Sequence, residues 1–142
     1  MKTNTFRLKQ GVIAALAVCF MGWNALAEPM LTGSGTEASP YQIASLADLE
    51  TFRDWVNATN DCAGEFFQLT ADIDMDGVNW TPIGDGSGYD VDFAGTFDGG
   101  GHAISNLVIE ADANYFALFG LVSGTIENLT IADSHVSGPK NS

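Results

Sequence analysis

The sequence has few basic residues and few cysteines, and both shortages exclude classes of function. Lys and Arg total 5 against 18 Asp and Glu. Three of the five precede residue 28, so residues 28–142 carry two basic and 18 acidic residues, a formal net charge of −16. Such a segment does not bind nucleic acid or an anionic membrane surface by charge attraction. Cys19 also precedes residue 28, so Cys62 is the one cysteine of residues 28–142 and no internal disulfide is expected there.

The segment from Met1 to Ala27 is predicted to be a secretory signal peptide. A basic start is followed by an apolar run over residues 11–23, which is too short to span a bilayer comfortably. Ala25-Leu26-Ala27 has the small-x-small pattern of a cleavage site. We therefore expect cleavage after Ala27 and an exported protein, secreted or held at the cell surface, with no transmembrane segment in the mature chain.

A short phrase, I-x-N-L-x-I, occurs at positions 104–109 and again at positions 126–131, so that the offset is 126 − 104 = 22. Offsets in the twenties are typical of one coil of a solenoid. The alternative is two unrelated short strands of similar spelling. If one coil equals one offset, parallel strands stack Ile104 on Ile126, Leu107 on Leu129 and Ile109 on Ile131. Asn106 and Asn128 are then expected at bends in the left-handed conformation, each amide bonded to an amide one coil away.

The flanks of this phrase resemble a known repeat. The segment GTFDGGGHAISNL at 95–107, followed by FALFG at 116–120 and GTIENL at 124–129, is similar to the GLUG-type repeats of bacterial secreted and surface proteins. The similarity covers most of the chain from Gly33 onward and departs at Ala117, where the repeat usually has its first glycine. It implies a parallel β-solenoid in an adhesin-like protein, and it implies no catalytic activity.

Residues 28–64 predict a short N-terminal strand at 41–43 and one amphipathic helix. Ser45, with Asp48 three positions later, resembles a capping box. An apolar stripe at spacings of three and four follows, formed by Leu46, Leu49, Phe52 and Val56. We expect this helix to cap the first coil, because a solenoid end exposes apolar groups and unpaired strand edges. The alternative is a helix that docks a partner.

Residues 65–142 predict the coils themselves. A strand over residues 65–75 is expected to point Phe67, Leu69, Ala71 and Ile73 inward, and Trp80 and Ile83 follow as further core anchors. The fold class is thus mainly β, a right-handed parallel β-helix (solenoid) start with one N-terminal capping α-helix. We expect the coils to be incomplete at the C-terminus, where further coils or a partner cover the end.

Aspartates form the one candidate metal site. Residues 72–77 spell D-x-D-x-D-G, the opening of a helix-loop-helix calcium loop. That motif is rejected, because its twelfth position, which requires a glutamate, is Ile83. A looser calcium site remains a hypothesis, with six candidate ligands: Asp72, Asp74, Asp76, Asp85, Asp90 and Asp92. The alternative is a strand with outward aspartates followed by a solvated loop, and no other cofactor is predicted.

No catalytic residues are predicted. The sequence has no G-x-S-x-G motif, and His102 and His135 have no Cys or His partner at metal-binding spacing. The leading hypothesis is an exported, non-catalytic surface or adhesion module, the N-terminal part of a longer protein, with a cell-surface carbohydrate or protein as its partner. The alternatives are the N-terminal part of a carbohydrate-active β-helix enzyme and a calcium-stabilised structural spacer.

Overall fold

The computed structural model describes residues 30–58, 61–84, 91–110 and 117–137, which form a mainly β structure with one helix. The helix is α2 (Leu46–Asn57). The strands are β1 (Tyr41–Ile43), β2 (Phe66–Leu69), β3 (Ile73–Asp74), β4 (Thr96–Asp98), β5 (Ala103–Ser105), β6 (Val108–Glu110), β7 (Thr125–Glu127), β8 (Thr130–Ala132) and β9 (His135–Ser137).

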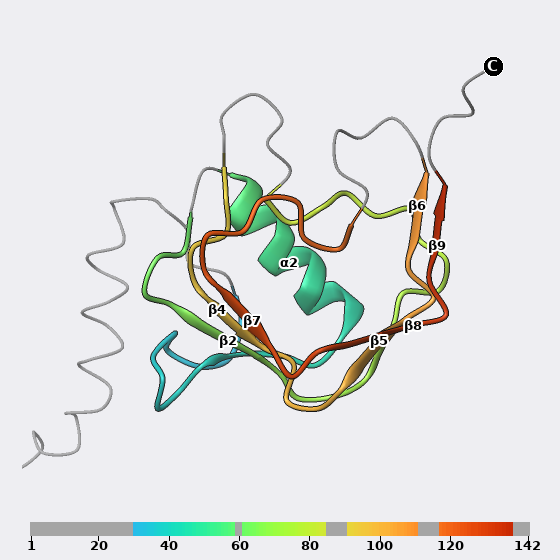
Figure 1. Ribbon diagram of the computed structural model, residues 1–142. Coiled ribbons are helices and arrows are strands. Elements are labelled where there is room, and N and C mark those ends of the chain that lie inside the picture. Colours follow the sequence, from blue (N-terminus) through green and yellow to red (C-terminus); the bar gives the residue numbers. More distant parts are fainter. Residues whose placement is uncertain (1–29, 59–60, 85–90, 111–116, 138–142) are drawn as a thin grey trace, which may run out of the picture.

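The strands pair in parallel within three sheets. The strand orders are β1-β2-β4-β7, β3-β5-β8 and β6-β9, so the chain visits the sheets in turn and then returns to the first. We call residues 66–83, 93–110 and 122–137 layers 1, 2 and 3. Figure 1 shows the strands of successive layers lying over one another, with β2, β4 and β7 on one side of the molecule and β5 and β8 on the next. Isolated parallel bridges join the layers between strands, among them Asn79 with Val108 and Phe93 with Val122.

The register of these layers differs from the one predicted. Ile126 pairs with Phe97 rather than with Ile104, and Ile104 pairs with Ile131, an offset of 131 − 104 = 27. The predicted stacking of one I-x-N-L-x-I phrase on the other is therefore wrong, for Leu107 and Ile109 as well. The reason is that the first copy of the phrase bends from β5 into β6, whereas the second bends from β7 into β8. The phrase encodes a corner of the chain rather than a whole layer.

The conformation expected at these corners is confirmed. Asn106 has φ 55° and Asn128 has φ 52°, both in the left-handed region. Asn adopts this region more readily than most residues, because its short polar side chain bonds locally. The same I-x-N-L-x-I motif thus produces the same bend at two different corners.

The predicted strand over residues 65–75 is divided by a corner. β2 belongs to the first sheet and β3 to the second, and Ala71, expected to point inward, is only half-buried between them. The other inward positions, Phe67, Leu69 and Ile73, are buried as predicted, and so are Trp80 and Ile83. The alternating pattern identified the core residues but could not show that the chain changes sheet at residues 70–72.

Helix α2 begins where the capping pattern predicted. The Ser45 hydroxyl accepts a hydrogen bond from the Asp48 N–H at 3.2 Å. The Asp48 carboxylate accepts one from the Ala44 N–H at 3.0 Å, one position before the amide that a capping box would use. The first of these bonds satisfies an amide that the first turn of a helix leaves without an intrahelical partner, and the second ties down the chain that enters the helix.

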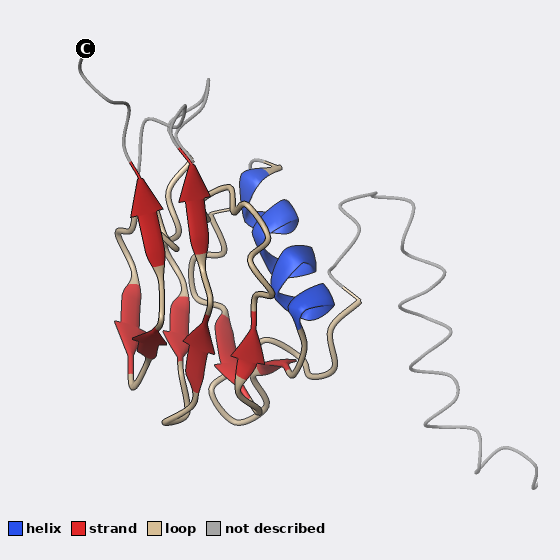
Figure 2. Cartoon of the chain, turned by 90° about the vertical axis from the view of Figure 1, so that its right-hand side faces the viewer, coloured by secondary structure: helices blue, strands red, loops and turns tan. Residues whose placement is uncertain are grey.

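The helix packs its apolar stripe against one end of the stacked strands. Leu49, Phe52 and Val56 are buried, and Leu46 is partly buried, as the spacing predicted. The Phe52 ring centroid lies 4.4 Å from that of Phe67 in layer 1 and 5.5 Å from that of Phe97 in layer 2. Figure 2 shows the helix at the end of the strand stack opposite to the last strand. Within the part of the chain that the structure describes, no helix combines the length and apolar character needed to cross a membrane.

Candidate functional site

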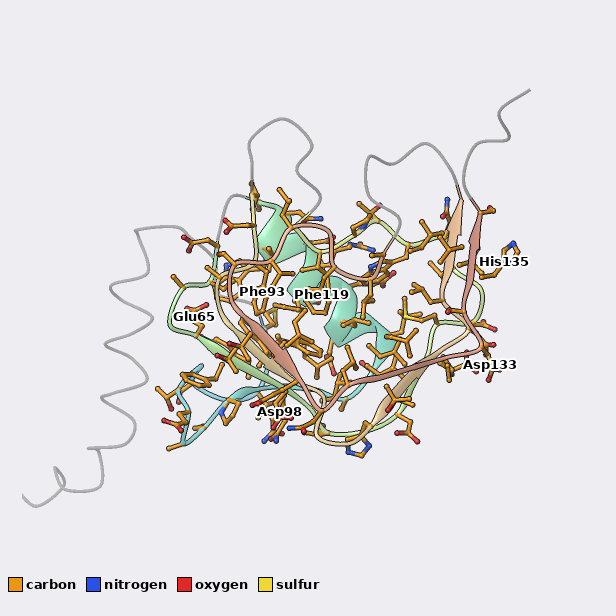
Figure 3. The ribbon with its side chains drawn as sticks, viewed as in Figure 1. Glu65, Phe93, Asp98, Phe119, Asp133 and His135 are labelled. Atoms are coloured by element: carbon orange, nitrogen blue, oxygen red, sulfur yellow. The ribbon has the colours of Figure 1, made fainter. Side chains whose placement is uncertain are left out.

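Two polar ladders run along the outer corners of the layers, and the first centres on Asp98 at the end of β4. One carboxylate oxygen accepts hydrogen bonds from the Asn128 side-chain amide at 2.9 Å and from the Gly100 N–H at 2.8 Å. The other oxygen accepts a bond from the Gln68 side-chain amide at 3.3 Å. Gln68, Asp98 and Asn128 belong to three successive layers, so this carboxylate links all of them. Figure 3 shows Asp98 on the outside of its corner, with Phe93 and Phe119 inside.

The second ladder repeats this arrangement at the next corner. Asp74, at the end of β3, accepts bonds from the Asn106 side-chain amide and from the Asp76 N–H, both at 2.8 Å. In each ladder the asparagine follows the residue that is aligned with the carboxylate in the next layer, Ser105 over Asp74 and Glu127 over Asp98. The predicted amide–amide bonds are therefore wrong, because the observed alignment places a carboxylate and not an amide beside each asparagine. An ionised carboxylate is a strong acceptor for such an amide.

These bonds hold the ladder carboxylates in their ionised form. The Asn128 amide, followed by the Gly100 N–H, lowers the pKa of Asp98 below its ordinary value. The Asn106 amide, followed by the Asp76 N–H, does the same to the pKa of Asp74. Hydrogen bonds donated to a carboxylate favour its charged form, which explains both directions.

His102 lies beside a third carboxylate. Its Nδ1 is 3.1 Å from Asp72 Oδ1, and the same oxygen accepts a hydrogen bond from the Ala103 N–H at 3.1 Å. The Ala103 bond is the larger cause of the lowered pKa of Asp72, and the His102 bond is the next. His102 directly follows the glycine-rich turn before β5.

The six predicted calcium ligands are only partly described. Asp72 and Asp74 are occupied by the hydrogen bonds given above, and Asp76 lies in the turn after β3 with φ 51°. Asp92 is half-buried, and Asp85 and Asp90 lie outside the described residues. Among the residues that are described, no three His, Cys, Asp or Glu side chains are grouped so as to hold a metal ion. The calcium site stays a prediction.

Cys62 has the environment of an apolar core residue. It is buried, and burial is the largest cause of a pKa raised far above that of an ordinary thiol, followed by the nearby Glu65 charge. The thiolate is the reactive form of cysteine, and burial disfavours this form at Cys62.

The layers end in an apolar face that is exposed, and we call this face the open end. It contains four apolar side chains of layer 3, with the exposed fractions Val122 39%, Ile126 37%, Ile131 40% and Val136 47%. Each is aligned with a buried residue of layer 2, in turn Phe93, Phe97, Ile104 and Ile109. The four residues occupy core positions, and they are exposed because the described chain places no layer over them.

The edges of layer 3 are open as well. Within the described residues, β7, β8 and β9 each pair with a strand on one side only. The Glu127 side chain, aligned with Asp98, has no hydrogen-bond partner among those residues, although it holds the position of the ladder carboxylate. A sheet edge with apolar side chains is a surface on which another strand can pair.

The sequence also contains a signal for the true register. Gly95-Thr96-Phe97-Asp98 returns as Gly124-Thr125-Ile126-Glu127, an offset of 124 − 95 = 29, and the last three pairs stack on one another from β4 to β7. The match is conservative rather than identical at two positions. The I-x-N-L-x-I phrase is identical at all four of its fixed positions, so it is the stronger sequence signal, and it predicts the wrong offset of 22.

Comparisons with known proteins give partial matches. No family model matches the chain. It is 40% identical over 119 residues to halomucin of Haloquadratum walsbyi, across 75% of this chain and 1% of halomucin. It is 32% identical over 114 residues to a protein of Evansella cellulosilytica named provisionally as a Gly-rich membrane protein, across 74% of this chain and 12% of that protein. The chain thus spans a small part of either relative.

One solved structure is also similar. It is the crystal structure of a Bacteroides ovatus protein assigned provisionally as an immunoglobulin A1 protease, with a TM-score of 0.58 and 32% sequence identity. The match covers 75% of this chain and 30% of the other, so the similarity concerns one part of the larger protein.

Proposed function

We propose that this chain supplies an exported, non-catalytic surface module, a right-handed parallel β-solenoid of the GLUG type in which α2 caps the first coil. One observation supports it most strongly. Residues at aligned positions of successive layers have side chains of the same kind, as in the apolar column Phe67, Phe97 and Ile126. Stacked layers of this kind bury a continuous core and form a stiff rod, in which each layer contacts only its neighbours.

The relatives support a location outside the cytoplasm. One bears the name halomucin and another is named provisionally as a membrane protein, and the chain starts with a predicted signal peptide. We propose that the module is secreted or held at the cell surface as part of a longer protein. Its partner, a cell-surface carbohydrate or protein, stays a prediction.

The ladder chemistry argues against glycosidase catalysis by the carboxylates described here, whereas an enzyme whose catalytic residues lie elsewhere in a longer protein stays an alternative. A glycosidase requires a general acid whose pKa is raised toward neutral pH, paired with a second carboxylate. Asp72, Asp74 and Asp98 have lowered pKa values, and hydrogen bonds from the protein hold them in place. These groups therefore serve better as structural acceptors than as proton donors. The protease assignment belongs to a larger protein, and nothing in the described residues brings that activity to this chain.

The test is thermal unfolding of the exported chain, followed by far-ultraviolet circular dichroism, in millimolar calcium and in chelator. We expect a strand-rich spectrum and the same midpoint in both solutions, because amide donors already satisfy the ladder carboxylates. A midpoint raised by calcium would support the structural spacer instead. A spectrum without strand signal would contradict the solenoid. Limited proteolysis of intact cells tests location, since a surface module is cleaved while cytoplasmic proteins remain whole.

A further inference from the structure

The open end has the chemistry of an interior surface. Its four residues, Val122, Ile126, Ile131 and Val136, repeat the inward pattern of layer 2, where every aligned residue is buried. Strands β7, β8 and β9, which form layer 3, each present one unpaired backbone edge within the described residues. A surface that continues both the apolar columns and the hydrogen-bond ladders of an existing interface is complementary to another layer of the same kind.

A glycine column adds a steric requirement. A Cβ atom on Gly95 would lie 2.7 Å from the Cys62 carbonyl oxygen, and one on Gly124 would lie 2.0 Å from the Gly95 carbonyl oxygen. Gly124 therefore approaches a carbonyl of layer 2, and Gly95 approaches one of the segment just before layer 1, at distances that only glycine permits. By continuation, a layer placed on Gly124 needs glycine at the aligned position.

Glu127 adds a polar requirement. At the same corner, the Asp98 carboxylate of layer 2 holds the Asn128 amide of layer 3 at 2.9 Å. Glu127 is the residue of layer 3 that is aligned with Asp98, and among the described residues its side chain has no partner. The position is thus supplied with an acceptor and lacks the amide donor from a following layer.

We infer that the open end binds a fourth parallel layer of the same repeat, joined in tandem after β9. That layer has glycine over Gly124, apolar residues over Ile126, Ile131 and Val136, and an asparagine whose amide donates to Glu127. The inference rests on the proposed solenoid, and it specifies the partner of this surface. A second copy of the chain is a poorer occupant, because each copy carries a net charge of −16 over residues 28–142 and the copies repel one another.

The test extends the full chain by one layer. A second copy of residues 111–137 is inserted directly after Ser137, which repeats the spacing between the paired residues Ile104 and Ile131. Amide hydrogen exchange is measured for residues 125–137 of the parent and the extended chain. We expect exchange of these amides to slow at least tenfold in the extended chain, and the thermal midpoint to rise. The matched control carries lysine at the inserted equivalents of Ile126 and Ile131, and it should exchange like the parent.

A second comparison tests the polar requirement. Glu127→Ala should lower the midpoint of the extended chain more than that of the parent, and Glu50→Ala, on the helix at the opposite end, should affect both equally. Equal exchange in the parent, extended and control chains would overturn the inference. So would a parent that already protects residues 125–137 and sediments as a dimer, because a second copy would then cover the open end. A parent without strand signal would contradict the proposed solenoid itself, a failure separate from these.

Discussion

Phe52 makes more aromatic contacts with the strand layers than any other residue of the helix, and its truncation gives the sharpest test of that packing. Its ring is fully buried, with centroids at 4.4 Å from Phe67, 5.3 Å from Phe93, 5.5 Å from Phe97 and 6.3 Å from Phe119. These partners belong to layers 1 and 2 and to the segment that follows layer 2. Phe52→Ala therefore opens a cavity among side chains that cannot all move inward together.

The expected cost is a large part of the total stability. Truncation of a buried Phe to Ala costs about 3–5 kcal/mol through lost burial and the cavity that remains. A domain of this size is stable by about 5–15 kcal/mol in all. With a urea dependence of about 1–3 kcal/mol per molar, the unfolding midpoint should fall by roughly 2 M. Urea titrations followed by tryptophan fluorescence and by circular dichroism measure it, and Trp55 and Trp80 both pack in or against the core.

Two further variants serve as controls for this prediction. Phe52→Leu preserves most of the volume and should lose less stability, which provides a measurement if the alanine variant does not fold. Glu50→Ala changes a half-buried helix residue away from the aromatic cluster and should cost within about 0.5 kcal/mol. If Phe52→Ala and Glu50→Ala have the same midpoint, the helix does not pack on the layers through Phe52.

Two further predictions concern the interface between layers 2 and 3. Gly124→Ala should destabilise the chain by about 1–3 kcal/mol in urea titrations, because its Cβ meets the Gly95 backbone, whereas Ser123→Ala should be neutral; equal effects would contradict the close approach. Since the folded pKa of Asp98 lies below its unfolded value, its bonds stabilise the fold above the unfolded pKa, and this contribution is lost as pH falls through the folded one. Asp98→Asn should therefore flatten the decline in thermal midpoint below about pH 4, and an unchanged decline would show that another group is responsible.

The sequence allowed the elements to be predicted better than their alignment. The capped helix with its stripe from Leu46 to Val56 followed from a cap residue and a helical period, both of which are local signals. The parallel pairing followed from a repeat. The register failed because it depends on how many residues each corner uses, and a corner phrase looks the same wherever it occurs. The prediction of one strand at residues 65–75 failed for a similar reason, since the buried residues Leu69 and Ile73 keep an even spacing across the bend and so continue the alternating pattern.

The polar ladders could not be predicted from the sequence, for a different reason. Asp98 and Asn128 are far apart in the sequence, and they meet only when the layers are correctly aligned. With the predicted alignment, Asn106 and Asn128 would have stacked on each other, and the aspartates would have seemed available for a cation. The correct alignment gives each asparagine a carboxylate, so the same residues become structural.

The exposed side chains of the open end allow an estimate of the free energy that burying them under a further layer would contribute. Burying a Val or Ile side chain completely is worth about 1.5–3 kcal/mol, and the four side chains of the open end are 37–47% exposed. Covering them would contribute about 2–5 kcal/mol, which approaches the lower end of the stability of a small domain. The two ends of the stack differ in this respect, because α2 buries its stripe against the strand layers while none of the described residues covers layer 3. A layer added in register would bury the apolar columns and pair the strand edges at once. A layer displaced by one residue would turn its apolar side chains outward and separate its asparagine from Glu127. The apolar columns therefore provide most of the attraction, and the glycine and carboxylate positions select the alignment.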